Sequence, residues 1–154
     1  MERSTTLANR LNEVLLDGHW IANTNFQAQL GGVTWEQATH KIGTLNTIAA
    51  LTYHVHYYLA GILNVFRGGK LEIRDKYSFD LPPINAETDW QGLVEIFLSN
   101  AQNFVTEVAK IPDSKLDEPF VEKKYGTYLR NIEGVIEHSY YHLGQVVLIR
   151  KMII

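Results

Sequence analysis

The feature that most constrains the fold is a stripe of apolar residues at helical spacing that begins just after residue 88. Its members recur every three or four residues, as expected for the buried face of an α-helix, and Pro112 marks its end because proline interrupts a helix. No segment of the chain combines alternating apolar and polar residues with the turn chemistry of a hairpin. The sequence therefore predicts an all-α fold. The members of the stripe are Trp90, Leu93, Val94, Phe97, Ala101, Phe104, Val105 and Val108.

Three further segments carry helical patterns of similar length. The first covers residues 4–30, with Ser4 as its expected N-cap and Gly18 as a point where it kinks or splits. The second covers residues 44–66, and the last runs over residues 128–151. Four helices of this length, each ~30–37 Å long, predict a helical bundle.

The connections between these helices also carry signals. Thr34 and Thr88 are each followed three residues later by a glutamine, which is the capping-box pattern and predicts a helix start. The polar segment 68–86 can reach ~60 Å when extended, so it is long enough to cross the full length of a bundle. The sequence permits such a crossover without requiring it. We expect one domain that covers residues 1–154.

Composition excludes several classes of protein. Lys and Arg number 14 against 17 Asp and Glu, so the net charge of −3 offers no strong positive field for nucleic acid. The chain has no cysteine, which excludes a disulfide scaffold and a thiol nucleophile. With no signal-peptide pattern at its start, we expect a cytoplasmic protein. No glycine-rich phosphate loop is present, so we expect no nucleotide cofactor.

One segment is long enough to span a bilayer. Residues 42–66 contain no Asp, Glu, Lys or Arg. The segment nevertheless carries asparagine, threonine and histidine side chains, which are costly in lipid. We expect a helix buried on most sides within a soluble protein, without contact with a membrane.

The last predicted helix carries two histidines four residues apart. His138 and His142 lie about 40° apart on one helix face, the spacing by which a helix offers two imidazoles to one metal. The zincin pattern is excluded because Ser139 follows the first histidine. The di-iron pattern is excluded because Val135 and Ser139 stand where it needs glutamates. A metal here would have imidazole ligands only; otherwise both histidines are hydrogen-bonded core residues.

Several other histidines are candidates for a third metal ligand. His54 and His56 lie about 200° apart on the second long helix, so they cannot both face one metal. This helix is apolar nearly all round, so periodicity does not decide which of the two faces inward. If His54 is a ligand, His56 is expected to be a packing or surface residue. His19 is a weaker candidate, and His40 lies in a polar stretch where solvent contact is expected.

Three stretches carry a family resemblance. They are Leu-Thr-Tyr-His at residues 51–54, Lys-Tyr-Gly-Thr-Tyr-Leu-Arg-Asn at 124–131, and Ile-Glu-His-Ser-Tyr-Tyr-His-Leu-Gly-Gln at 136–145. Together they resemble the DinB/YfiT-like superfamily of metal-dependent enzymes, over nearly the whole chain. The resemblance implies a four-helix bundle of up-down-down-up topology, with a long crossover loop after the second helix. It also implies a homodimer and a divalent metal held by His54, His138 and His142.

The resemblance does not fix one reaction. Relatives look like thiol S-transferases that use low-molecular-weight thiols, or isomerases that depend on them. The first hypothesis is therefore a metal-dependent transferase or hydrolase acting on a small molecule, with zinc or nickel as the metal. Tyr58, Asn131 and His19 are the candidates to line its pocket. The alternatives are a non-catalytic bundle that binds a metal or a small ligand, and a structural bundle whose histidines are only core residues.

Overall fold

The structure is a computed structural model, and it describes residues 2–154. Every regular element in that range is helical, with one isolated β-bridge between Pro119 and Thr127, so the predicted all-α class is confirmed. The long helices are α1 (Glu2–Leu15), α4 (Ile48–Phe66), α5 (Glu87–Ala109) and α7 (Tyr128–Ile153). The short elements are α2 (Phe26–Leu30), α3 (Trp35–Ala38), α6 (Asp113–Leu116) and the 3-10 turns η1 (Asp75–Tyr77) and η2 (Lys123–Tyr125).

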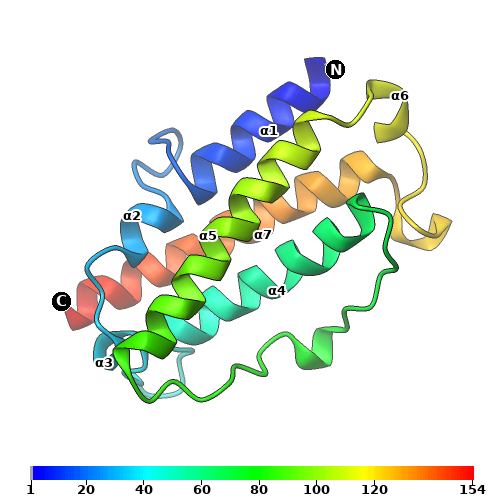
Figure 1. Cartoon of the computed structure of the whole chain (residues 1–154). Helices are drawn as coiled ribbons and strands as arrows, with labels where there is room; N and C mark the ends of the chain where they lie inside the picture. The colour runs from blue at the N-terminus through cyan, green and yellow to red at the C-terminus, as the bar shows by residue number, and fades with distance from the viewer. Residues whose placement is uncertain (1) are drawn as a thin grey trace.

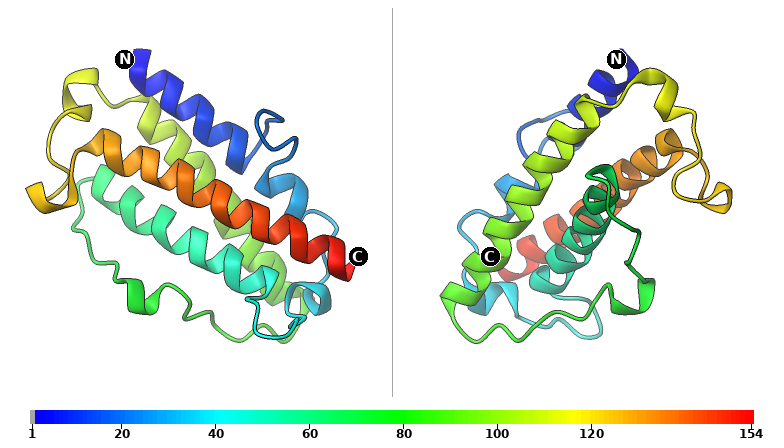
Figure 2. Two further views of the ribbon diagram at one scale, coloured as in Figure 1. Left: turned by 180° about the vertical axis from the view of Figure 1, so that it is seen from behind. Right: turned by 45° about the vertical axis from the view of Figure 1, so that its right-hand side comes forward.

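The four long helices pack side by side around one core (Figure 1). Contacts join α1 to α5, α5 to α4, α4 to α7 and α7 to α1, so these helices form a closed ring. Helices α4 and α5 run in one direction along the molecule, whereas α1 and α7 run in the other (Figure 1). The chain between α4 and α5 therefore has to return along the length of α4. Residues 67–86 do so on the outside of the molecule (Figure 2).

The core is apolar and draws large side chains from all four long helices. Leu11, Leu59, Phe97 and Ile132 are fully buried, one from each helix, and each such side chain gains ~1.5–3 kcal/mol from leaving water. The indole of Trp90 is also buried, and its Nε1 donates to the backbone carbonyl of Val33 at 2.8 Å. Within residues 2–154 no helix has the length and hydropathy needed to cross a membrane.

Several predicted helix boundaries are confirmed. Helix α5 covers the apolar stripe and ends before Pro112, and α7 begins directly after Thr127, whose hydroxyl accepts from the Arg130 amide. Thr34 and Gln37 form both hydrogen bonds of the predicted capping box at the start of α3. The second long helix ends at Phe66 as predicted but begins at Ile48, four residues later than expected. The reason is that the Thr47 side chain caps it by accepting from the Ala50 amide.

The first predicted helix is wrong at its N-cap and is split where a break was expected. Ser4 is not an N-cap, because it lies inside α1 and its hydroxyl donates to the backbone carbonyl of Ile111. The expected split at Gly18 is confirmed, because residues 16–25 are not helical and the segment 4–30 contains two separate helices. The Asn25 side chain starts the second one by accepting from the Ala28 amide, and its own amide donates to the Gly18 carbonyl.

The capping box predicted at Thr88 is also wrong. Helix α5 already begins at Glu87, with Ala86 as its N-cap, so Thr88 lies inside the first turn. The Gln91 side chain donates to the Glu87 carboxylate at 2.9 Å. The helix therefore starts two residues ahead of the pattern, with two acidic residues in its first turn, where the helix dipole favours them.

Candidate metal centre

Three histidines meet where α4 and α7 pack against each other. His54 comes from the middle of α4, and His138 and His142 come from one face of α7, as their spacing predicts. One ring nitrogen from each lies within 4.8 Å of the other two. His54 and His142 are buried and His138 is half-buried. The two helices lie side by side and run in opposite directions (Figure 2), so two residues a turn apart on α7 can both face one residue on α4.

Hydrogen bonds orient two of the three rings. The Nδ1 of His54 lies 3.2 Å from the Ser78 backbone carbonyl, which can only accept, so this nitrogen carries the proton. The Nδ1 of His142 donates in the same way to Oε1 of Gln145 at 2.7 Å. Both rings therefore present an unprotonated Nε2. Metal-bound histidines almost always donate their second ring N–H to such a partner, which fixes the tautomer and the ring orientation.

His138 completes the cluster. Its Nε2 lies 3.0 Å from the Nε2 of His54, and in the metal-free protein the His138 Nε2–H donates to that lone pair. Two imidazole nitrogens bound to one metal at about 2.1 Å lie ~3.0–3.4 Å apart. The observed separation fits this range, and small side-chain movements bring the third nitrogen to the same distance. Three neutral imidazoles are a donor set that suits zinc, nickel, copper or iron.

The three rings share an environment that keeps them neutral. Burial lowers the pKa of His54 and of His142 below the ordinary value. Burial is also the main reason why the pKa of His138 falls to about 4, with the neighbouring His142 and His54 adding to the effect. A metal ligand must be the neutral imidazole, so near pH 7 little work is needed to remove protons from this cluster.

The connection between α4 and α5 covers the cluster from outside. Phe79 stacks on His54, with ring centroids 3.9 Å apart and an angle of 7° between the planes. Asp75 lies in the same connection, and its carboxylate accepts a hydrogen bond from the Tyr58 hydroxyl at 2.6 Å. The Tyr58 ring also makes edge contacts with His54 and His138, as expected for a residue that shares the face of His54. Burial and then the Asp75 hydrogen bond raise the pKa of Tyr58 to about 12.

The sequence did not assign roles to Asp75, Ser78, Phe79 and Gln145. Gln145 could have been found, because it lies three residues after His142 on the same helix and can therefore reach it. Ser78 acts through its backbone carbonyl, which no side-chain pattern reveals. Asp75 begins the short 3-10 turn η1 and Phe79 follows it, in a connection too short in regular structure to show periodicity. Only the path of that connection along α4 brings them to the histidines.

A pocket of about 390 Å³ opens beside His138, between α4 and the first half of α7. Two predicted pocket residues, Tyr58 and Asn131, line it. The Asn131 side-chain amide donates to the backbone carbonyls of Tyr125 and Thr127, both at 2.8 Å, so it also holds the start of α7. A larger pocket, of about 770 Å³, includes Phe66 and lies at the far end of α4, where none of its lining residues is a histidine.

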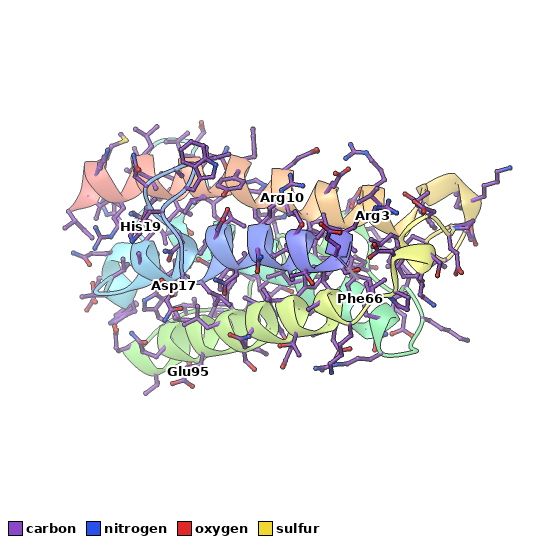
Figure 3. All side chains as sticks on the ribbon, turned by 90° about the horizontal axis from the view of Figure 1, so that it is seen from above. Arg3, Arg10, Asp17, His19, Phe66 and Glu95 are labelled. Atoms are coloured by element: carbon purple, nitrogen blue, oxygen red, sulfur yellow. The ribbon has the colours of Figure 1, made fainter. Side chains whose placement is uncertain are left out.

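The other histidines stay outside the cluster. His56 faces α5, where the Asn100 side-chain amide donates to its Nδ1 at 3.1 Å, and burial lowers its pKa. It is therefore a packing residue, as expected when His54 is the one that faces α7. His19 and His40 are exposed. The structure does not bring His19 into the group of three or into the adjacent pocket; it lies on the loop after α1, toward the opposite end from Phe66 (Figure 3).

Comparison with known proteins adds no identification. No family model, no curated protein and no solved structure matches this chain. Function is therefore inferred from the geometry of the histidine cluster and from the sequence resemblance described above.

Proposed function

We propose that this protein is a metal-dependent enzyme in which His54, His138 and His142 hold a divalent transition metal, zinc or nickel. The observation that carries the proposal is the convergence of three ring nitrogens within 4.8 Å. Two of the rings are already oriented by Nδ1–H donation to Ser78 and Gln145. Three protein ligands leave further coordination positions open, which is the usual arrangement of a catalytic site and differs from a closed structural one.

The residues around the cluster support chemistry on a small molecule. A divalent metal held by neutral imidazoles keeps its double charge and supplies Lewis acidity, which lowers the pKa of a water or thiol that it contacts. Tyr58 and Asp75 form a hydrogen-bonded pair against two of the imidazoles. Phe79 shields one face of His54 from solvent. The pocket beside His138 gives a ligand access to the same place.

The family resemblance extends the proposal. We place the chain with the DinB/YfiT-like four-helix bundles, with the up-down-down-up topology and the long crossover after the second long helix. The directions of α1, α4, α5 and α7 and the path of residues 67–86 support this assignment. The reaction proposed is the transfer of a low-molecular-weight thiol, or a hydrolysis, by a cytoplasmic homodimer.

Metal content tests the proposal directly. The untagged wild type is compared by elemental analysis with His54→Ala and His138→Ala, and His56→Ala is the matched control on the same helix. We expect about one equivalent of metal per chain in the wild type and in the control, and almost none in the other two. Wild type that stays metal-free after incubation with zinc and with nickel contradicts the proposal.

A second measurement separates an enzyme from a binding protein. Metal-loaded wild type is incubated with electrophile–thiol pairs and with ester and amide substrates. Turnover that is lost in His138→Ala supports the enzyme. If the protein binds one equivalent of metal but turns over none of these substrates, it is a metal-binding bundle and not an enzyme for them.

A further inference from the structure

The pocket beside the histidine cluster follows α7 for two turns. Arg130, Gly134 and His138 are spaced by four residues, and all three line it. Arg130 and His138 are eight residues apart, and at a rise of 1.5 Å per residue this places them ~12 Å apart along the helix axis. The pocket therefore has a positive charge at one end and the histidine cluster at the other.

The walls between these two ends are mostly apolar. Tyr58 and Ile62 from α4 face Val135 and Gly134 from α7, and Tyr125 closes the side near η2. The volume of about 390 Å³ is typical of a site for a small organic molecule. A Cβ atom added to Gly134 would have no neighbouring heavy atom within 4 Å, so there is open space directly above this glycine. An aromatic ring or a branched alkyl group fits such a space.

The charge at the far end is available to a ligand. The Arg130 side chain is 63% exposed, and its guanidinium pairs with Glu137 on the surface at 3.3 Å, an ion pair that contributes little and is easily exchanged. None of the described residues that line the pocket carries a carboxylate side chain. Asn131, which also lines the pocket, uses its amide hydrogens on two backbone carbonyls. The pocket is thus complementary to an anion, and guanidinium groups recognise carboxylates well.

We propose that this pocket selects a small carboxylate with an aromatic or branched apolar body as the substrate. Its carboxylate pairs with Arg130, its body lies over Gly134, and its opposite end reaches the histidine cluster. Arg130 and Gly134 are then specificity-determining residues. This inference rests on the proposed function, because it treats the histidine cluster as the reacting centre.

The test uses binding as the readout, with 3-phenylpropionate as the probe. The full chain is titrated while backbone amide signals are followed by NMR, once loaded with zinc and once after chelation. A Cβ at Gly134 meets no heavy atom within 4 Å, so the side chain of Gly134→Leu can extend into the pocket. Leucine also favours a helix more than glycine does, so the variant is expected to fold. Gly144→Leu is the matched control, because Gly144 is also in α7 with open space above it but does not line the pocket.

We expect saturable binding to the wild type and to Gly144→Leu, and at least tenfold weaker binding to Gly134→Leu, in both metal states. We also expect the uncharged analogue 3-phenylpropanamide to bind the wild type at least fivefold more weakly than the carboxylate. Arg130→Gln removes this preference. Equal binding to Gly134→Leu and Gly144→Leu, no saturable binding, or a carboxylate preference that survives in Arg130→Gln overturns the inference.

The two proposals fail separately. A wild type that binds no metal but binds the probe with these dependences contradicts the proposed metal enzyme and leaves the ligand pocket in place. A wild type that holds one equivalent of metal but binds the probe equally well in all variants supports the metal centre and overturns the assigned substrate class.

Discussion

His54 and His56 are two residues apart on α4, and the structure gives them different surroundings. Burial lowers the pKa of both side chains. His56 faces α5 and meets a single amide, Asn100, which satisfies the one ring nitrogen it contacts. His54 faces α7 and meets two further imidazoles, in addition to the Ser78 carbonyl behind it. Burial therefore does not distinguish the candidate ligand from the packing residue; the chemistry of the neighbours does.

The difference between the two regions lies in how lone pairs are used. An amide supplies a donor, so the contact between Asn100 and His56 is complete without any added group. Imidazoles that turn their Nδ1–H groups outward direct their lone pairs at one another. In the metal-free cluster, the His138 proton fills part of this deficit by donating to His54. A cation at the centre would be bound by one nitrogen of each ring once the His138 proton moves from Nε2 to Nδ1. Metal addition should therefore affect the His54 side of α4 and leave the His56 side unchanged.

The largest effect expected from this comparison is stabilisation by zinc. A ligand that binds only the folded state at a thousand times its dissociation constant adds ~4 kcal/mol to the free energy of unfolding. For a chain of this length, that corresponds to a rise in the melting temperature of about 10 °C. Thermal unfolding with and without zinc should show this rise for the wild type and for His56→Ala. His142→Ala should show none, and an equal rise in all three proteins would mean that zinc binds elsewhere.

A smaller effect is expected from the side-chain amides that contact each histidine. Gln145→Ala removes the acceptor that orients His142, and removal of such a supporting group typically weakens metal affinity ~10–100-fold. Asn100→Ala removes the equivalent partner of His56 and should leave zinc affinity unchanged, while lowering the free energy of unfolding by ~1 kcal/mol. Competition titration against a chromogenic chelator measures both affinities. Matching losses in the two variants would contradict the distinction between the two faces of α4.

The sequence predicted much of the fold where local patterns dominate. Helices α5 and α7 follow from their apolar spacing, the stop at Pro112 and the cap at Thr127. In the first segment Gly18 indicated the position of the break, but the extent of the break depends on a local turn in which the Asn25 side chain bonds to both Gly18 and Ala28. A helical pattern on either side of such a turn does not reveal where the two helices end and begin.

The candidate site shows the same division. The common face of His138 and His142 is a consequence of helix geometry, so their spacing was sufficient to predict it. The choice between His54 and His56 depends on which helix packs against each face of α4, and a helix that is apolar nearly all round does not encode this choice. The resemblance indicated His54, and the packing of α7 against α4 brings that residue to the other two. The parts contributed by Asp75, Ser78 and Phe79 depend on the path of an irregular segment, which only the three-dimensional structure provides.

The smallest expected effect is the pH dependence of the metal-free protein. His138 has a folded-state pKa of about 4, whereas in the unfolded chain the ordinary histidine value of ~6.5 applies. Between these two values the unfolded state binds a proton that the folded state does not. The contribution to stability is therefore complete above pH ~6.5, declines as the pH falls, and is lost below pH 4. Because the side chain is only half-buried, solvent screening should reduce the effect to ~1 kcal/mol.

Denaturant unfolding of the chelated protein between pH 7 and pH 4 measures this contribution. His138→Gln should show a shallower decline in the free energy of unfolding than the wild type. His56→Gln should also flatten the curve, because burial lowers the pKa of His56 in the same direction. The same measurement with zinc present distinguishes His138→Gln from His56→Gln. When zinc is present, acid must also displace the metal, so the wild type and His56→Gln should become more sensitive to acid, whereas His138→Gln should not respond to zinc. A zinc response that survives in His138→Gln would show that this side chain is only a buried neighbour of the other two histidines, as His56 is of Asn100.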